Sequence, residues 1–202
     1  MRVKAMAAVM ALTVMLSGCG DGGLSAEERA EYESRAAVMG VSLDYIYVTE
    51  SEGYSQATGG GAGPYAGNGF SDHYADASGL FFQLIVDDDP ELTDDSCPAL
   101  PVAGVGTSAA VTCTRDGEGW YRVSGAQHEY AENRDGLVIR ADAVTAVPAG
   151  DLRQAVENAR PATPEELDAM LPECVSSCGV VPRGDLPPGG DMPPQDPPNK
   201  GG

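Results

Sequence analysis

The chain is poor in positive charge: its 202 residues include 12 Lys and Arg against 31 Asp and Glu, for a formal net charge of −19. Binding to nucleic acid needs a basic surface that replaces the counterions of the phosphates. Docking on anionic lipid by charge needs the same kind of surface. The composition therefore argues against both modes of binding, and we expect no nucleic-acid partner.

Long hydrophobic runs are also absent. No stretch of 18 or more apolar residues occurs, so the sequence predicts no transmembrane helix. The apolar run at residues 5–16 has the length of the core of an export signal. Arg2 and Lys4 precede it and supply the positive end that such signals carry.

The segment Leu16-Ser17-Gly18-Cys19 follows this run and resembles the lipobox of bacterial lipoproteins. In that family a diacylglycerol is attached to the cysteine thiol, and a signal peptidase cleaves just before the cysteine. The resemblance implies a lipoprotein signal peptide at residues 1–18 and a lipidated tether at residues 19–24. It also implies that acyl chains on Cys19 anchor the protein to the extracytoplasmic face of the cell membrane. The alternative is that Cys19 is an ordinary thiol after an ordinary export signal.

Four other cysteines are present: Cys97, Cys113, Cys174 and Cys178. An even number in an exported chain favours two disulfides, for which three pairings are possible. We favour Cys97–Cys113, which would staple an acidic loop to the strand that follows it, together with Cys174–Cys178. Redox chemistry is less favoured, because the Cys-x₃-Cys spacing differs from the Cys-x₂-Cys of thioredoxin-like sites. Zinc is also less favoured, because it would need four thiolates from distant segments in an oxidising compartment.

Residues 25–179 predict one α+β domain. Capping boxes begin the first and last helices, at Ser25–Glu28 and Thr163–Glu166, and residues 151–160 have an amphipathic helical pattern. Asp-Gly turns between short strands imply an antiparallel sheet, for which we expect about four to six strands. The strand candidates are residues 43–49, 80–86, 108–114, 119–124, 127–131 and 137–141.

Three further expectations concern the remaining segments. Residues 53–70 are rich in glycine and predict no regular structure, with aromatic side chains that either anchor a partner or pin the loop to the core. Trp120 is expected in the core. Residues 180–202 are rich in proline and glycine and predict a disordered tail.

The acidic run at residues 87–95 is the first candidate for chemistry. Its six carboxylates repel each other, and a calcium ion would relieve that repulsion, with Asp87, Asp89 and Glu91 as candidate ligands. The run lacks the glycine and the final glutamate that an EF-hand loop needs. A solvated loop is therefore the favoured interpretation, and we expect no metal and no cofactor.

His73 is the second candidate, as a general base among Asp72, Asp76 and two nearby serines, Ser71 and Ser78. No G-x-S-x-G motif accompanies it, so a hydrolase is a minor alternative. The other histidine, His128, is expected on the surface or in a hairpin.

The sequence therefore favours a non-enzymatic, lipid-anchored extracytoplasmic module that binds a protein or another envelope component. A calcium-binding envelope module and a hydrolase around His73 are the alternatives. Beyond the processing signal, the residues resemble no characterised family.

Overall fold

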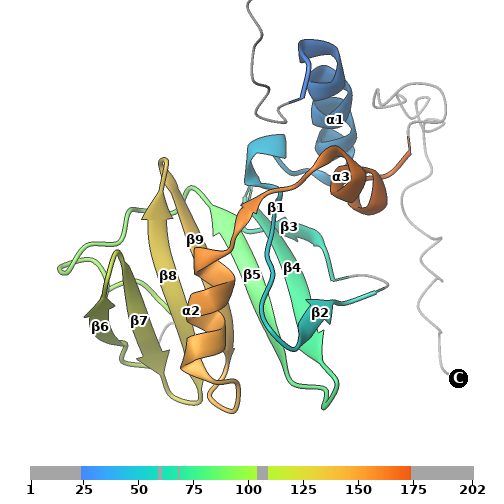
Figure 1. Cartoon of the computed structure of the whole chain (residues 1–202). Helices are drawn as coiled ribbons and strands as arrows, with labels where there is room; N and C mark the ends of the chain where they lie inside the picture. The colour runs from blue at the N-terminus through green and yellow to red at the C-terminus, as the bar shows by residue number, and fades with distance from the viewer. Residues whose placement is uncertain (1–23, 59–60, 68, 104–108, 174–202) are drawn as a thin grey trace, which may run out of the picture.

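The protein is described by a computed structural model over residues 24–58, 61–67, 69–103 and 109–173 (Figure 1). It belongs to the predicted α+β class, with three helices and mostly antiparallel strands. In chain order the elements are α1 (Ala26–Met39), a 3-10 turn (Leu43–Tyr45), β1 (Tyr47–Val48), β2 (Tyr54–Gln56), β3 (Gly63–Tyr65), β4 (Gly69–Asp76), β5 (Phe81–Asp87), β6 (Thr112–Asp116), β7 (Gly119–Ser124), β8 (Gln127–Arg134), β9 (Leu137–Val144), α2 (Ala149–Glu157), β10 (Arg160–Pro161) and α3 (Pro164–Met170).

The main sheet has eight strands, more than the four to six expected. Its order is β2-β4-β5-β9-β8-β7-β6, and β3 pairs with β4 on the same side as β2. All of these pairs are antiparallel. The Asp-Gly hairpins are confirmed: Gly117, Asp135 and Gly136 have φ angles of 62°, 54° and 82°, the left-handed region that such turns require.

Two strand predictions were wrong. The Gly-rich segment 53–70 contains β2, β3 and the start of β4. Gly69 is needed there because an added Cβ would lie 2.8 Å from the Tyr65 carbonyl oxygen and 2.9 Å from Asp87 Cβ. The expected strand at 43–49 is instead a 3-10 turn followed by the short β1, which pairs with β10.

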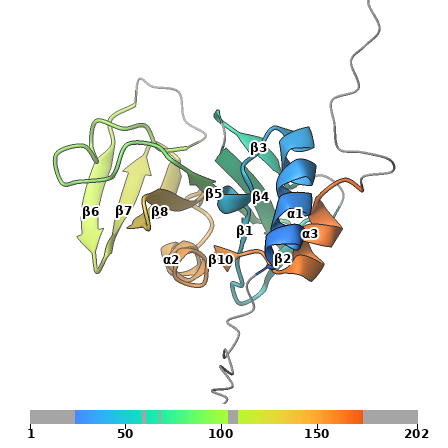
Figure 2. The same ribbon diagram turned by 90° about the horizontal axis from the view of Figure 1, so that it is seen from above.

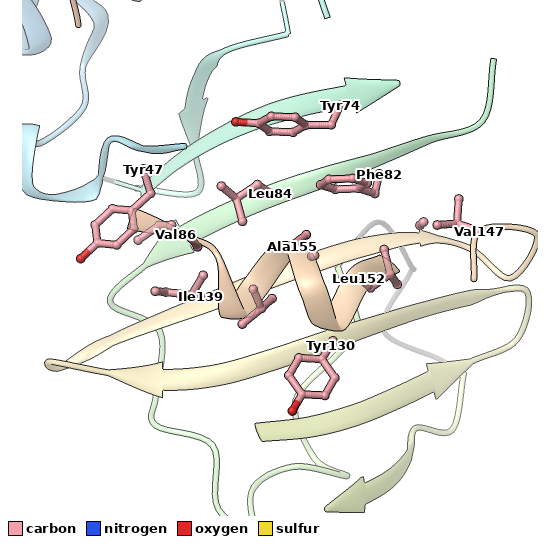
Figure 3. Close-up of a cluster of buried hydrophobic side chains, with 14 residues drawn as sticks. Tyr47, Tyr74, Phe82, Leu84, Val86, Tyr130, Ile139, Val147, Leu152 and Ala155 are labelled. Atoms are coloured by element: carbon pink, nitrogen blue, oxygen red, sulfur yellow. The ribbon is translucent and has the colours of Figure 1, made fainter. Parts of the chain in front are cut away.

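One face of the sheet, which we call the helix face, is covered by α2. Alternate side chains of four strands point toward this helix and are apolar or aromatic, among them Tyr74, Phe82, Leu84, Tyr130 and Ile139. Figure 3 shows Leu152 and Ala155 of α2 lying among these side chains. Burying a leucine or phenylalanine side chain in this way contributes about 1.5–3 kcal/mol.

Helices α1 and α3 pack together at one end of the sheet (Figure 2). Both begin with the predicted capping boxes, which satisfy free N–H groups in the first turn. Tyr32 and Arg35 of α1 bind Asp168 of α3, with Arg35 Nη1 2.6 Å from a carboxylate oxygen. The last predicted helix and the first one therefore form one small layer beside the sheet.

The segment between β5 and β6 crosses the opposite face of the sheet (Figure 2). A third cluster forms there around Leu92, Cys97, Trp120, Ala131 and Val138. Trp120 is 4% exposed, as predicted. The predicted disulfide Cys97–Cys113 is present and joins this segment to β6. The Cys174–Cys178 pair, Cys19, the signal peptide at residues 1–18 and the tail at 180–202 lie outside the described residues.

Candidate functional site

The acidic run at residues 87–95 is held by an arginine. Arg140 of β9 donates from Nη2 to a carboxylate oxygen of Asp87 and to Asp89 Oδ2, the latter at 2.8 Å. Asp94 accepts from the Trp120 indole at 3.3 Å, and the side chain of Glu91 is exposed. Across the described ranges, no group of three or more His, Cys, Asp and Glu side chains is placed to hold a metal ion. Asp87 and Asp89 thus bind a guanidinium group in this arrangement.

His73 lies on β4 without a catalytic neighbour among the described residues. Its Nδ1 is 2.9 Å from the Gly61 carbonyl oxygen, and its ring packs against Phe81. Asp72 accepts from the backbone N–H of His73 and from Gln56, and its side chain is on the opposite face of the strand. No serine hydroxyl hydrogen-bonds the imidazole within this part of the structure, so the geometry offers no activated nucleophile.

The aromatic residues of the 53–74 segment mostly pin that segment to the core. Tyr54 and Tyr74 both contact Phe82, with ring centroids 5.1 Å apart in each pair. Phe70 is buried against α1 and α3. These contacts favour the interpretation in which the aromatic side chains hold this segment to the core.

A polar groove of about 520 Å³ lies between the chain that joins β1 to β2, helix α2 and the first turn of α3. Its walls are tied together by side-chain hydrogen bonds to the backbone. Gln154 Oε1 accepts from the backbone N–H of Glu52 at 3.0 Å, and Asn158 Nδ2 donates to the Glu50 carbonyl at 2.7 Å. Thr49 donates to the Ala155 carbonyl at the groove floor. The groove is therefore preformed.

The groove is acidic. Three carboxylates line it, and one of them, Glu166, binds Arg160 and Thr163. The hydrogen bond from Arg160 lowers the pKa of Glu166 to about 2, so this carboxylate is ionised at neutral pH. The positive charge of Arg160 balances it. Glu50 and Glu52 form no ion pair with the described residues. Strand β2 borders the groove at the edge of the sheet and has β4 as its one described partner.

Charged residues that the sequence analysis did not single out lie on the face of the sheet opposite α2. We call it the polar face, defined by Gln83, Arg122, Glu129, Arg140 and Asp142. Asp142 pairs directly with Gln83 on one side and with Glu129 on the other, and Glu129 pairs in turn with Arg122. Alternation of polar and apolar residues in strands 127–134 and 137–144 was the signal available in the sequence.

Arg122 and Glu129 form a fully buried ion pair. Glu129 also accepts from the backbone N–H of Ala103 at 2.9 Å. Arg122 also donates to three backbone carbonyls of the covering segment, those of Cys97, Leu100 and Pro101. The pair therefore joins the sheet to the segment that covers it, and each charge has its partners.

Asp142 differs from these residues because it is buried without a partner. It is 7% exposed, and its side chain has no hydrogen bond within the described residues. Burial, and secondarily the negative charge of Glu129, raise the pKa of Asp142 to about 7, while Arg140 acts in the opposite direction. This carboxyl group therefore changes its charge near neutral pH.

His128 lies in the β7–β8 hairpin, one of the two places expected for it, and it is buried instead of being on the surface. It lies on the helix face, where its Nδ1 is 2.8 Å from the Tyr121 hydroxyl. Burial lowers the pKa of His128, so the ring is neutral at neutral pH. This histidine is part of the core.

No helix among the described residues combines the length and the apolar character needed to cross a membrane. Comparisons of the chain with protein-family models, with curated proteins and with solved structures found no match.

Proposed function

We propose that this protein is a lipid-anchored, extracytoplasmic binding module whose contact surface is the acidic groove beside β2. The observation that carries the proposal is the preformed groove, which presents the uncommitted carboxylates of Glu50 and Glu52 next to a strand edge. The lipobox-like segment ending at Cys19 supports the anchoring part of the proposal.

The anchor and the groove act together in this proposal. Leu24 is the fifth residue after Cys19, so the two positions lie at most about 18 Å apart when the chain is extended. The domain is then held close to the membrane surface, which raises its effective concentration toward partners on the same membrane. The acyl chains thus supply proximity, and the groove supplies selectivity.

The partner that fits this groove is an extended polypeptide segment with basic side chains. Lysine or arginine would pair with Glu50 and Glu52, and the chain's negative charge would speed the encounter. The backbone of the segment would hydrogen-bond to the open edge of β2, as in other cases of β-strand addition.

In-cell photo-crosslinking tests the proposal. A photoreactive residue replaces Ser55, which lines the groove, or Glu118, which lies in the hairpin at the opposite edge of the sheet. We expect capture of a Lys- or Arg-rich peptide from position 55 alone, with a lower yield in the Glu50→Gln/Glu52→Gln double variant.

The anchored part of the proposal is tested in the same experiment with Cys19→Ala. We expect this change to reduce capture from position 55 several-fold while leaving the purified domain folded. Equal capture from positions 55 and 118, or capture that the two glutamine substitutions leave unchanged, contradicts the groove as the contact surface. Equal capture with and without Cys19 contradicts the role of the anchor.

A further inference from the structure

The polar face of the sheet contains buried acceptors that have no donor. Asp142 Oδ1 and Gln127 Oε1 are both buried without a hydrogen-bond partner in the part of the chain that the structure describes. An unsatisfied buried polar group is costly, because it has given up its hydrogen bonds to water without gaining others. A buried group of this kind therefore suggests an occupant that donates hydrogen bonds.

The two acceptors are neighbours. Asp142 pairs with Glu129 and Val144 pairs with Gln127, so Asp142 and Gln127 occupy diagonal positions on adjacent strands. Both side chains project from the same face, because paired residues share a face and alternate residues of a strand return to it. Diagonal neighbours of this kind lie within reach of each other's long side chains, so we expect one small donor between the strands to meet both oxygens.

The charges around these acceptors favour a cation. The ion pairs of this face join Asp87, Asp89 and Glu129 to Arg122 and Arg140. Asp94 and Arg115 contact Trp120 on the same face. Glu129 is matched by Arg122, whereas Arg140 is shared by Asp87 and Asp89. The Nε atoms of Arg122 and Arg140 are also buried without an acceptor among the described residues. Terminal nitrogens of each guanidinium, however, donate to Glu129 and a backbone carbonyl in one case and to Asp87 and Asp89 in the other. Asp142 thus forms no ion pair with any of the described residues, and the nearby Arg140 is committed to Asp87 and Asp89.

Apolar side chains lie next to this position. Phe81 and Val144 are 55% and 41% exposed, large values for residues of their type. The pairing of Phe82 with Ala143 places Phe81 beside Val144, on the polar face and one step along the strands from Gln83 and Asp142. An alkyl chain entering from solvent would pack against these two side chains.

We propose that Asp142 and Gln127 form a binding site for a primary alkylammonium group, such as a lysine side chain or a free alkylamine. An ammonium carries three N–H donors on a compact charge, and its aliphatic stem matches Phe81 and Val144. Calcium would need six to eight oxygen ligands, more than these side chains supply. This site is separate from the acidic groove, and it stands or falls independently of the function proposed there.

Thermal unfolding at pH 8 tests the site with defined probes. n-Butylammonium chloride and Nα-acetyl-lysine N-methylamide are compared with potassium chloride and tetramethylammonium chloride at matched ionic strength. Ligand at ten times its Kd is expected to raise the Tm by about 4 °C. Tetramethylammonium has no N–H donor and is expected to act like potassium. A response to the lysine derivative assigns the site to lysine side chains, and a response to butylammonium alone assigns it to free amines.

Two variants locate the effect. Asp142→Asn is expected to abolish the response, and Gln127→Met to weaken the apparent affinity about tenfold, while Glu118→Gln leaves it intact. If one of the first two fails to fold, the other still decides. The proposal is overturned if butylammonium and tetramethylammonium raise the Tm equally, or if a folded Asp142→Asn protein responds like the wild type. Such a result would mean that water molecules and a proton on Asp142 satisfy the buried oxygens.

Discussion

On the helix face, the fully buried side chains of Leu84, Ile139 and Leu152 carry no polar atom, whereas on the polar face Arg122 and Glu129 are buried just as deeply. Both faces belong to the same sheet, and each is covered, one by α2 and the other by the segment between β5 and β6. Apolar packing therefore stabilises both faces, and the polar face adds buried ion pairs to its cluster around Trp120.

Apolar packing stabilises the helix face in proportion to the area removed from water, so truncation there costs the lost contacts and the cavity that remains. A buried ion pair contributes little net stability, because the desolvation of the charges opposes their attraction. Removing one charge nevertheless leaves the other unpaired at high cost. On the polar face, replacing both members of an ion pair should therefore cost less than replacing one of them. Three predictions test this contrast, and a fourth compares it with a local contact outside both faces.

The largest effect is expected for Arg122→Ala. It leaves Glu129 buried and unpaired and removes the bonds to three carbonyls, so we expect a loss of about 4 kcal/mol in the free energy of unfolding, measured with urea. The matched control is Arg122→Met/Glu129→Gln, which removes both charges and should recover part of that loss. A double variant less stable than Arg122→Ala would contradict the contrast between the faces.

Leu152→Ala on the helix face should cost about 3 kcal/mol, because Leu152 is fully buried between α2 and the sheet. Arg153→Ala on the exposed side of the same helix is the control. It removes surface ion pairs with Asp116 and Glu157, which solvent screens, and should cost far less than the loss of Leu152. Similar losses for the two variants would show that α2 does not provide the core of this face.

The stability of the protein should depend on pH through Asp142. Its folded pKa of about 7 exceeds its unfolded value of about 3.9, so the folded protein retains a proton that the unfolded chain releases. This contribution is complete below about pH 4 and is lost as the pH rises to about 7. Asp142→Asn should remove the dependence and be more stable than the wild type at pH 8 by about 2 kcal/mol.

Urea titrations at pH 5 and pH 8 measure this difference, with Glu118→Gln as the exposed control. Referring each variant to the wild type at the same pH separates Asp142 from carboxylates with lowered pKa values, such as Glu166. An Asp142→Asn protein with the wild-type pH dependence would show that Asp142 is ionised and solvated in the folded state.

The smallest effect is expected from a local contact outside both faces. Ser25→Ala removes the side chain that accepts from the Glu28 backbone N–H at 3.2 Å, and should cost about 1 kcal/mol. Circular dichroism during thermal unfolding reports this loss, with the exposed Glu31→Ala as a control. A loss as large as that of Leu152→Ala would mean that this cap holds α1 and α3 to the sheet.

Much of the fold was predictable because local signals specify it. Capping boxes begin α1 and α3, and the two Asp-Gly turns impose antiparallel pairing between neighbouring strands. The Cys97–Cys113 disulfide also follows from local spacing, since it closes a short loop onto the next strand. The lipoprotein signal stays a prediction from residues 1–19.

The strands within residues 53–70 were missed because glycine there suggested a loop. Strands β2 and β3 form by pairing with β4, and β4 pairs in turn with β5. A pattern of neighbouring residues in the sequence does not reveal pairing between separate strands. The groove beside β2 was missed for the same reason, because its walls come from residues about 100 positions apart.

The sequence by itself determined the starts of two helices and the turns of the hairpins, because each depends on residues a few positions apart in the chain. The class of the fold followed from the order of these local elements. The tertiary structure alone decided that Arg140 binds the acidic run, that Glu129 and Asp142 are paired across two strands, and that Asp142 has no partner among the described residues. The physical reason is that strand register and burial set the surroundings of a charge, and both arise only when distant segments pack together.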